Sequence, residues 1–168
     1  VLLLGGDAGA DRWGLRPDSI TVASVDADSG QSVLLGLPRN LQNVPFPKGT
    51  VMRDQWPRGF DCGDECLLNA VYTWAETHKE LFDGTDEEAR PGIQATRDAV
   101  EAITGLQISY TVAIDLQGFQ SLIDAVGGID LEVMTRTPIG GGSSKIEGWI
   151  EPGVQHLDGF HALWFARA

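Results

Sequence analysis

The chain has 168 residues, 42% of them hydrophobic and 21% charged, a composition typical of a globular protein with a buried core. Its formal net charge of −12 argues against a general nucleic-acid binder, because such proteins neutralise phosphates with clustered basic side chains. The basic residues are mostly arginine, so a few of them could form a local phosphate site on an acidic body. No apolar run approaches the length of a membrane-spanning helix.

Three apolar runs near the N-terminus predict strands over residues 1–6, 19–27 and 32–37. The last two are joined by the Asp-Ser-Gly stretch 28–30, which favours a hairpin turn. Residues 40–63 are rich in proline and glycine and are expected to form a long irregular loop. A helix is predicted over 64–79, with Asp64 as a plausible N-cap.

Helices and strands alternate over the rest of the chain. Pro91 predicts the start of a helix and Gly105 its end. The further elements are expected, in order, to be a strand over 109–114, a short helix over 116–126, a strand over 129–134 and a helical or mixed segment over 157–167. This alternation indicates an α/β fold with a central mixed sheet covered by helices. No domain linker is visible, so a single domain over 1–168 is expected.

Cys62 and Cys66 are the only cysteines. Without a nearby histidine they make a poor zinc site, and their spacing is one residue too long for a CxxC redox motif. A four-residue separation at a helix start brings the two Cα atoms close to the disulfide range, so a disulfide is favoured. A disulfide would imply an oxidising, extracytoplasmic setting, and two buried free thiols are the alternative.

Charged side chains stand where the N-terminal apolar runs begin or end. Asp7 follows the first run, Arg16 and Asp18 precede the second, and Arg39 follows the third. Carboxylates suit Mg²⁺, which is usually held by one or two of them together with substrate phosphate oxygens. The planar guanidinium of arginine suits the phosphate, because it makes bidentate, charge-assisted hydrogen bonds. Each residue alone is more often a solvated loop charge, but together they suggest a phosphate-and-metal site.

Six stretches of the chain carry a family resemblance: LLLGGD, RPDS, GLPRNL, LLNAVY, YTVAIDLQGFQSLIDAVGGIDLEV and GVQHLDGFHALWFAR. They span essentially the whole chain in order, and the fifth is the most specific. They resemble the LytR-CpsA-Psr family, the bacterial enzymes that attach glycopolymers to peptidoglycan. The preference for arginine over lysine and the Cys62–Cys66 insertion resemble the actinobacterial branch of that family.

The resemblance implies a three-layer α-β-α sandwich whose central mixed sheet and helices enclose an apolar tunnel for a polyprenyl lipid. It implies a phosphotransferase that moves a phospho-glycopolymer, of the arabinogalactan or teichoic-acid type, from polyprenyl pyrophosphate to peptidoglycan. Pyrophosphatase activity would accompany the transfer, and Mg²⁺ would be the cofactor, with Mn²⁺ as a substitute. Such an enzyme works at the extracytoplasmic face of the membrane or in the cell wall. A membrane anchor and a C-terminal segment are therefore expected outside this chain.

The resemblance also assigns roles by position. The catalytic arginines that hold the pyrophosphate would be Arg16, Arg39 and Arg167. The carboxylates linked to the metal would be Asp7 and Asp18. The substrate-binding residues would be Asn69, in the first long helix, and Asn40, where the family often has aspartate. The chain has Leu67 where the family usually has lysine, and the family's second arginine after Arg167 falls outside it.

Two other functions are compatible with these residues. A Mg-dependent pyrophosphate or nucleotide hydrolase would have a polar pocket and no long apolar tunnel. A non-catalytic polyprenyl-lipid-binding wall module would hold its ligand without turnover, so its arginines could be replaced without loss of activity. An apolar cavity beside Arg39 would favour the transferase over the hydrolase.

Overall fold

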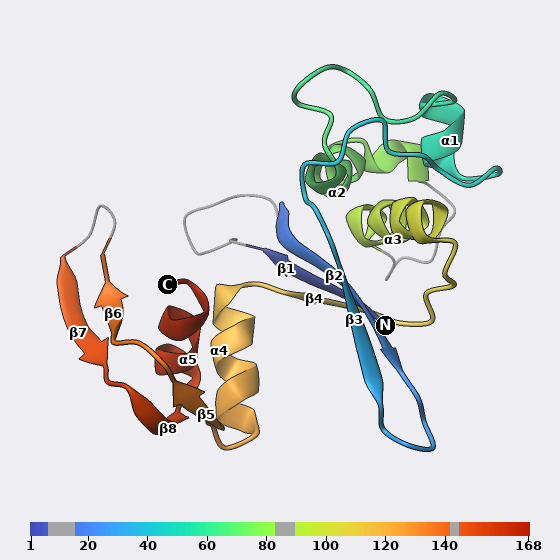
Figure 1. The fold of residues 1–168 in the computed structure, drawn as a ribbon. Coiled ribbons are helices and arrows are strands. Elements are labelled where there is room, and N and C mark those ends of the chain that lie inside the picture. Colours follow the sequence, from blue (N-terminus) through green and yellow to red (C-terminus); the bar gives the residue numbers. More distant parts are fainter. Residues whose placement is uncertain (7–15, 83–89, 142–144) are drawn as a thin grey trace. The chain divides into compact units, whose positions relative to one another are not determined.

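The computed structural model describes residues 1–6, 16–82, 90–141 and 145–168. The chain divides into two compact units, Val1–Asp115 and Leu116–Ala168, and each is described by itself (Figure 1). Among the described residues, no helix is both long enough and apolar enough to cross a bilayer.

The first unit is built on a four-stranded sheet with the strand order β3-β2-β1-β4. Its strands are β1 (Leu2–Gly6), β2 (Pro17–Val25), β3 (Ser32–Leu37) and β4 (Thr111–Ile114). β2 runs antiparallel to both β1 and β3, whereas β1 and β4 are parallel. The predicted α/β class with a central mixed sheet is therefore confirmed.

The β2–β3 hairpin forms at the predicted turn. The Asp26 carboxylate accepts hydrogen bonds from the backbone N–H groups of Asp28 and Ser29, at 3.1 and 2.7 Å. Hydrogen bonds from Ser29, its backbone N–H above all, hold the pKa of the Asp26 carboxyl below its ordinary value. Gly30 has a φ of 72°, in the left-handed region that glycine enters without steric cost.

Helices α2 (Leu68–Thr77) and α3 (Pro91–Thr104) pack on one face of this sheet (Figure 1). α3 begins and ends as predicted, because Pro91 fits its first turn and Gly105 closes it with a φ of 69°. The predicted start of α2 was wrong: the helix begins at Leu68, with Leu67 rather than Asp64 as its N-cap. The reason is that the first amides of α2 bond to the turn after β3 and not to an aspartate side chain.

Alternate residues of the strands supply the core beneath these helices. Leu2 and Leu4 of β1 are at most 1% exposed, whereas Leu3, which points to the opposite face, is 37% exposed. α2 and α3 approach each other at Gly92, where a Cβ atom would lie only 2.7 Å from the ring of Tyr72. The close-packed core of the first unit therefore lies between the sheet and these two helices.

The segment expected as an irregular loop, residues 40–63, contains the short helix α1 (Val51–Gln55). Thr50 caps this helix, because its hydroxyl oxygen accepts a hydrogen bond from the Arg53 N–H at 3.2 Å. A helix of five residues is too short to produce a recognisable hydrophobic period in the sequence. A 3₁₀ turn, η1 (Lys79–Phe82), follows α2.

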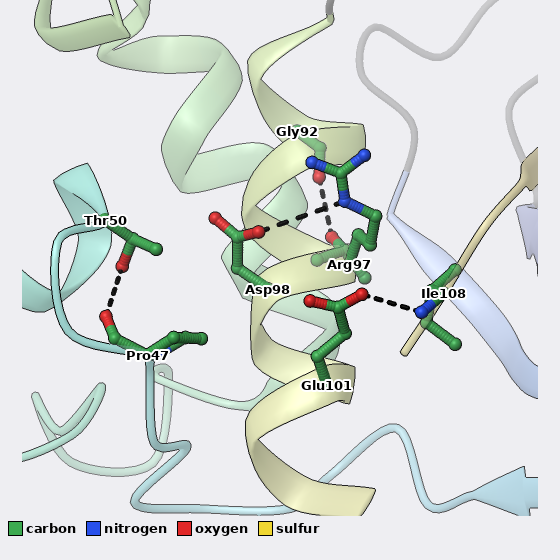
Figure 2. Close-up of polar contacts among 8 residues, drawn as sticks. Pro47, Thr50, Gly92, Arg97, Asp98, Glu101 and Ile108 are labelled. Atoms are coloured by element: carbon green, nitrogen blue, oxygen red, sulfur yellow. Dashed lines mark hydrogen bonds and ion pairs between the residues drawn. The ribbon is translucent and has the colours of Figure 1, made fainter. Parts of the chain in front are cut away.

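α3 carries a buried carboxylate, Asp98, which is 8% exposed (Figure 2). The Nε atom of the adjacent Arg97 lies 3.9 Å from Asp98 Oδ1, and Glu101 accepts a hydrogen bond from the Ile108 N–H at 2.7 Å (Figure 2). Burial raises the pKa of Asp98 to about 6, with the Arg97 charge opposing the shift and the Glu101 charge adding to it. The fold therefore favours the neutral form of Asp98 up to about pH 6.

We expect Asp98→Asn to stabilise the protein above pH 6 by about 1–2 kcal/mol relative to wild type, and to have little effect near pH 4. The pKa of Asp98 is raised from 3.8, so the stability that its neutral form contributes is complete below pH 4 and is lost as the pH rises through 6. The asparagine stays neutral throughout. Urea unfolding at pH 4.5 and 7.5 measures the difference, with Asp54→Asn on exposed α1 as the charge-removal control. A stability difference that is the same at both pH values would contradict the prediction.

The described residues of the second unit form two helices and two small sheets. Its elements are α4 (Leu116–Ala125), β5 (Ile129–Val133), β6 (Thr137–Gly140), β7 (Ile146–Ile150), β8 (Gly153–Leu157) and α5 (Gly159–Ala166). β5 pairs with β8 and β6 with β7, both antiparallel. The predicted strand β5 and helix α4 are confirmed, whereas β6, β7 and β8 were missed. These strands are short and carry glycine or proline, which weakens the alternation that marks a strand.

Candidate functional site

Asp18 and Arg39 form an ion pair at one edge of the first unit's sheet. β2 and β3 are antiparallel with Ile20 opposite Leu37, so the start of β2 and the end of β3 lie at the same edge. Arg39 Nη1 donates a hydrogen bond to Asp18 Oδ1. The two side chains are 56% and 44% exposed, which leaves them accessible to a ligand. The structure thus brings together one residue predicted for the pyrophosphate and one predicted for the metal.

The first backbone amides of α2 hold the turn that carries Arg39. The Leu68 N–H donates to the Leu41 carbonyl at 2.9 Å, and the Asn69 N–H donates to the Arg39 carbonyl at 3.0 Å. Such amides have no partner within their own helix, and the N-cap residue Leu67 offers no side-chain acceptor. The turn therefore replaces a side-chain cap. It fixes the main chain of Arg39 while the guanidinium stays exposed.

The Asn69 side chain is buried at the start of α2. The residue is 4% exposed, and its Oδ1 atom has no hydrogen-bond partner among the residues that the structure describes. Buried polar atoms in native proteins almost always have a partner, so an unsatisfied one suggests a site for a water or a ligand. This burial rules out a solvated helix face for Asn69, and the substrate-binding role stays a prediction. Asn40, the other predicted asparagine, is exposed in the turn beside Arg39.

A groove of about 440 Å³ runs along α2 and contains Arg16, the residue directly before β2. Its lining also includes Trp74, Glu65, Thr73 and Phe60, the last of which is only 1% exposed. Of these residues, only Arg16 has a role predicted from the sequence. The others lie in the segment expected as a loop or in the helix predicted over 64–79, and no motif marked them. The neighbouring cysteine pair was the one local signal.

Cys62 and Cys66 form the predicted disulfide, with their Cα atoms 5.2 Å apart. Gly63 has a φ of 88°, and its N–H donates to the Asp61 carboxylate at 3.2 Å, which tightens the turn between the cysteines. The bridge lies directly before α2 and lines the groove that contains Arg16.

The remaining predicted site residues are Arg167 and Asp7. Arg167 belongs to the second unit, at the C-terminal end of α5, where its guanidinium carbon lies 5.5 Å from the centroid of the Trp164 ring. Asp7 lies outside the described residues. The strand before it, β1, ends at Gly6, which pairs with Pro17 at the start of β2. The chain therefore leaves β1 at the sheet edge where Asp18 lies.

Among the residues that the structure describes, Asp18 supplies the carboxylate that could bind a hard cation at this edge of the sheet. Among the residues described, no group of three or more histidine, cysteine or acidic side chains could hold a metal ion. This donor set fits Mg²⁺, which commonly takes one or two protein carboxylates and completes its shell with phosphate oxygens and water.

Fold and site together define a mixed α/β domain with an arginine–carboxylate pair at one edge of its sheet. A family model described as the LytR_cpsA_psr family matches residues 1–168. The chain belongs to the LytR-CpsA-Psr family.

Named relatives are similar along most or all of the chain. One is the polyisoprenyl-teichoic acid–peptidoglycan teichoic acid transferase TagU of Oceanobacillus iheyensis, 27% identical over 99% of this chain and 42% of its own length. Another is TagU of Halalkalibacterium halodurans, 24% identical over 79% of this chain and 34% of its own length. The chain thus spans less than half the length of these relatives.

Solved structures share the fold. Bacillus subtilis TagV superposes with a TM-score of 0.63 at 25% identity, over 99% of this chain and 54% of its own. The family protein YwtF (TagT) with bound octaprenyl pyrophosphate lipid superposes with a TM-score of 0.63 at 18% identity, over 99% of this chain and 55% of its own. The second similarity supports the fold alone.

Proposed function

We propose that this chain is the part of a phosphotransferase that moves a phospho-glycopolymer from a polyprenyl-pyrophosphate carrier to a peptidoglycan hydroxyl. The observation that carries the proposal is the exposed Arg39–Asp18 pair, whose turn is held by the start of α2. The names of the relatives support it, because TagU is a teichoic acid transferase that acts from a polyisoprenyl carrier. The lipid bound in the TagT structure is a polyprenyl pyrophosphate.

Arg39 and Arg16 are the groups of the first unit that would bind the pyrophosphate, and the family position adds Arg167. A guanidinium makes two parallel hydrogen bonds to phosphate oxygens, so it both orients the phosphate and neutralises its charge. Arg39 bonds to Asp18 in the free protein, and a bound phosphate would compete for that guanidinium. Fixed cations at the point where negative charge develops supply most of the catalysis in phosphoryl transfer.

The reaction exchanges one phosphorus–oxygen bond for another. The oxygen of the acceptor hydroxyl bonds to the phosphorus nearer the glycan, and the bond from that phosphorus to the bridging oxygen breaks. Polyprenyl phosphate leaves with the bonding electrons, and the hydroxyl proton is released. Water in place of the acceptor would give the pyrophosphatase side activity.

Asp18, together with Asp7, would hold Mg²⁺ or its substitute Mn²⁺. When bound, such an ion neutralises charge on phosphate oxygens. The exposed Asp18 carboxylate bonds to Arg39 through one oxygen only. The same carboxylate could therefore both pair with Arg39 and bind the metal ion.

The proposed site of action is the extracytoplasmic face of the membrane or the cell wall, with the protein tethered by an anchor outside this chain. The disulfide supports an oxidising compartment, because such bonds are rare in the reducing cytoplasm. Arabinogalactan or a teichoic acid is the glycopolymer class that we propose as cargo.

A lipid tail sheltered by the protein should make long-chain donors bind more tightly than short-chain ones. Each buried CH₂ group contributes roughly 0.8 kcal/mol, so a few additional isoprene units should improve the dissociation constant at least about 100-fold. Competition binding with prenyl pyrophosphates of increasing chain length measures this. Equal affinities for all lengths would contradict the lipid tunnel and favour a soluble pyrophosphate hydrolase. Tight binding of long chains without turnover would favour a non-catalytic wall module.

A further inference from the structure

The Cys62–Cys66 bridge ties an exposed loop to the core of the first unit. Cys62 is exposed, whereas Cys66 is 3% exposed and belongs to the buried cluster beneath the sheet and helices. Residues 63–65 between them are all exposed. Among the described residues, the hydrogen bonds of this loop stay within it: the Gly63 N–H donates to the Asp61 carboxylate and the Cys66 N–H to the Gly63 carbonyl, both at 3.2 Å. The bridge therefore restricts a loop that is otherwise held weakly.

The bridge ends one residue before the N-cap of α2, and this helix start has no side-chain cap. Leu67 is the N-cap residue, and its side chain accepts no hydrogen bond. The Asn69 N–H, in the first turn, donates instead to the Arg39 carbonyl at 3.0 Å. The direction of such a free amide is set by the backbone that leads into the helix. A change in the backbone at Cys66 would therefore be transmitted to the main chain of Arg39.

The effect of the bridge is expected at the helix start and not in the stability of the whole unit. The two cysteines are separated by 4 positions in sequence, and a disulfide that closes a short loop removes less chain entropy than one that closes a long loop. The core between the sheet and the helices is built from side chains of several elements and does not depend on this covalent bond. Reduction of the bridge should thus loosen residues 61–67 while the fold persists.

We infer that the Cys62–Cys66 bridge positions Arg39 for pyrophosphate binding by fixing the start of α2. The inference rests on the proposed function, in which Arg39 binds the pyrophosphate, and adds a positioning element to it. The sulfur atoms contact no substrate in this scheme. They act through the Asn69 amide and the carbonyl of Arg39.

The groove that contains Arg16 offers a second route by which the bridge could affect the site. Both cysteines line this groove, so reduction could change its wall directly. Arg16 directly precedes β2 and is held by that strand, whereas Arg39 is held by the start of α2. The two arginines therefore distinguish a bridge that acts through the helix start from one that acts through the groove wall.

The test measures the dissociation constant of geranylgeranyl pyrophosphate, in the presence of Mg²⁺, before and after reduction with dithiothreitol. Two electrons and two protons pass from this dithiol to the bridge, which becomes two thiols while the reagent becomes a cyclic disulfide. Reduction leaves the buried side chain of Cys66 in the core. We expect the dissociation constant of the wild type to rise about fivefold, the factor that the loss of a helix cap typically causes. Reoxidation should restore it.

A double-mutant cycle shows whether the loss passes through Arg39. In Arg39→Ala, reduction should leave the dissociation constant unchanged, because no guanidinium remains to be positioned. In Arg16→Ala, reduction should still raise it about fivefold. Cys62→Ser replaces the exposed cysteine, so it should bind like the reduced wild type and show no response to dithiothreitol. Amide exchange should become faster at Asn69 on reduction and stay slow in the middle of α3.

The outcomes separate this inference from the proposed function. Equal affinities of the oxidised and reduced wild type, or the same loss in Arg39→Ala as in the wild type, would overturn the positioning role. A loss that disappears in Arg16→Ala and not in Arg39→Ala would assign the bridge to the groove wall instead. Unfolding of the reduced protein at the assay temperature would make the bridge a general support of the fold and would also overturn the inference. Failure of the oxidised wild type to bind the probe would contradict the proposed function itself.

Discussion

Replacing Arg39 with alanine should lower both transfer and pyrophosphatase rates by about 10²–10³, the usual loss when one fixed donor to developing charge is removed. The Arg39 main chain is held by the Asn69 amide, so the wild-type guanidinium starts from a fixed base at the sheet edge. The fold should survive, because the ion pair with Asp18 is exposed and such pairs contribute about 0–1 kcal/mol. Steady-state rates and a thermal unfolding curve measure the two effects.

Arg136→Ala is a matched control for this experiment. Arg136 also pairs with a carboxylate, Glu151, at 2.9 Å, and the two side chains are 53% and 58% exposed. It lies in the second unit and has no proposed role, so its loss should leave the rates near wild type. Arg39→Lys should recover only part of the rate, because lysine restores the charge and not the two-pronged geometry. Near-wild-type turnover of the alanine variant would remove Arg39 from the mechanism.

Gly159→Ala should destabilise the second unit by about 3 kcal/mol, the upper end of the usual cost of overpacking. Gly159 is the first residue of α5, and its N–H donates to the Asp124 carboxylate of α4 at 2.7 Å. A Cβ atom there would lie 2.7 Å from the carbonyl carbon of Gln120, also in α4. Backbone atoms cannot rotate away as a flexible side chain can, so the two helices would have to separate.

Urea unfolding, together with amide hydrogen exchange in α4 and α5, measures the effect. Gly36→Ala is the control, because a Cβ atom at Gly36 in β3 would meet no atom within 4 Å. The control should change stability by less than about 1 kcal/mol. Equal stability of the two variants would show that α4 and α5 accommodate the added methyl group.

The sequence by itself determined the strands, turns and helix ends that are set by residues close together in the chain. Apolar runs identified β1, β2 and β3, and the Asp28-Ser29-Gly30 stretch located the hairpin turn. Pro91 and Gly105 marked both ends of α3, because each acts on its own stretch of backbone. The spacing of two cysteines was enough for the disulfide. Family motifs predicted Arg39 and Asp18 as site residues, and the two side chains pair in the structure.

Only the tertiary structure decided how distant residues combine. The register of β2 against β3 places Asp18 and Arg39 together, and the Arg39 carbonyl determines where α2 begins. The burial of Asp98 and the walls of the groove likewise depend on segments that fold against one another. Propensities and turn signals act over a few residues, whereas these contacts require chain segments far apart in sequence to meet. Local sequence patterns therefore predict the helices and strands, whereas tertiary packing determines the geometry of the site.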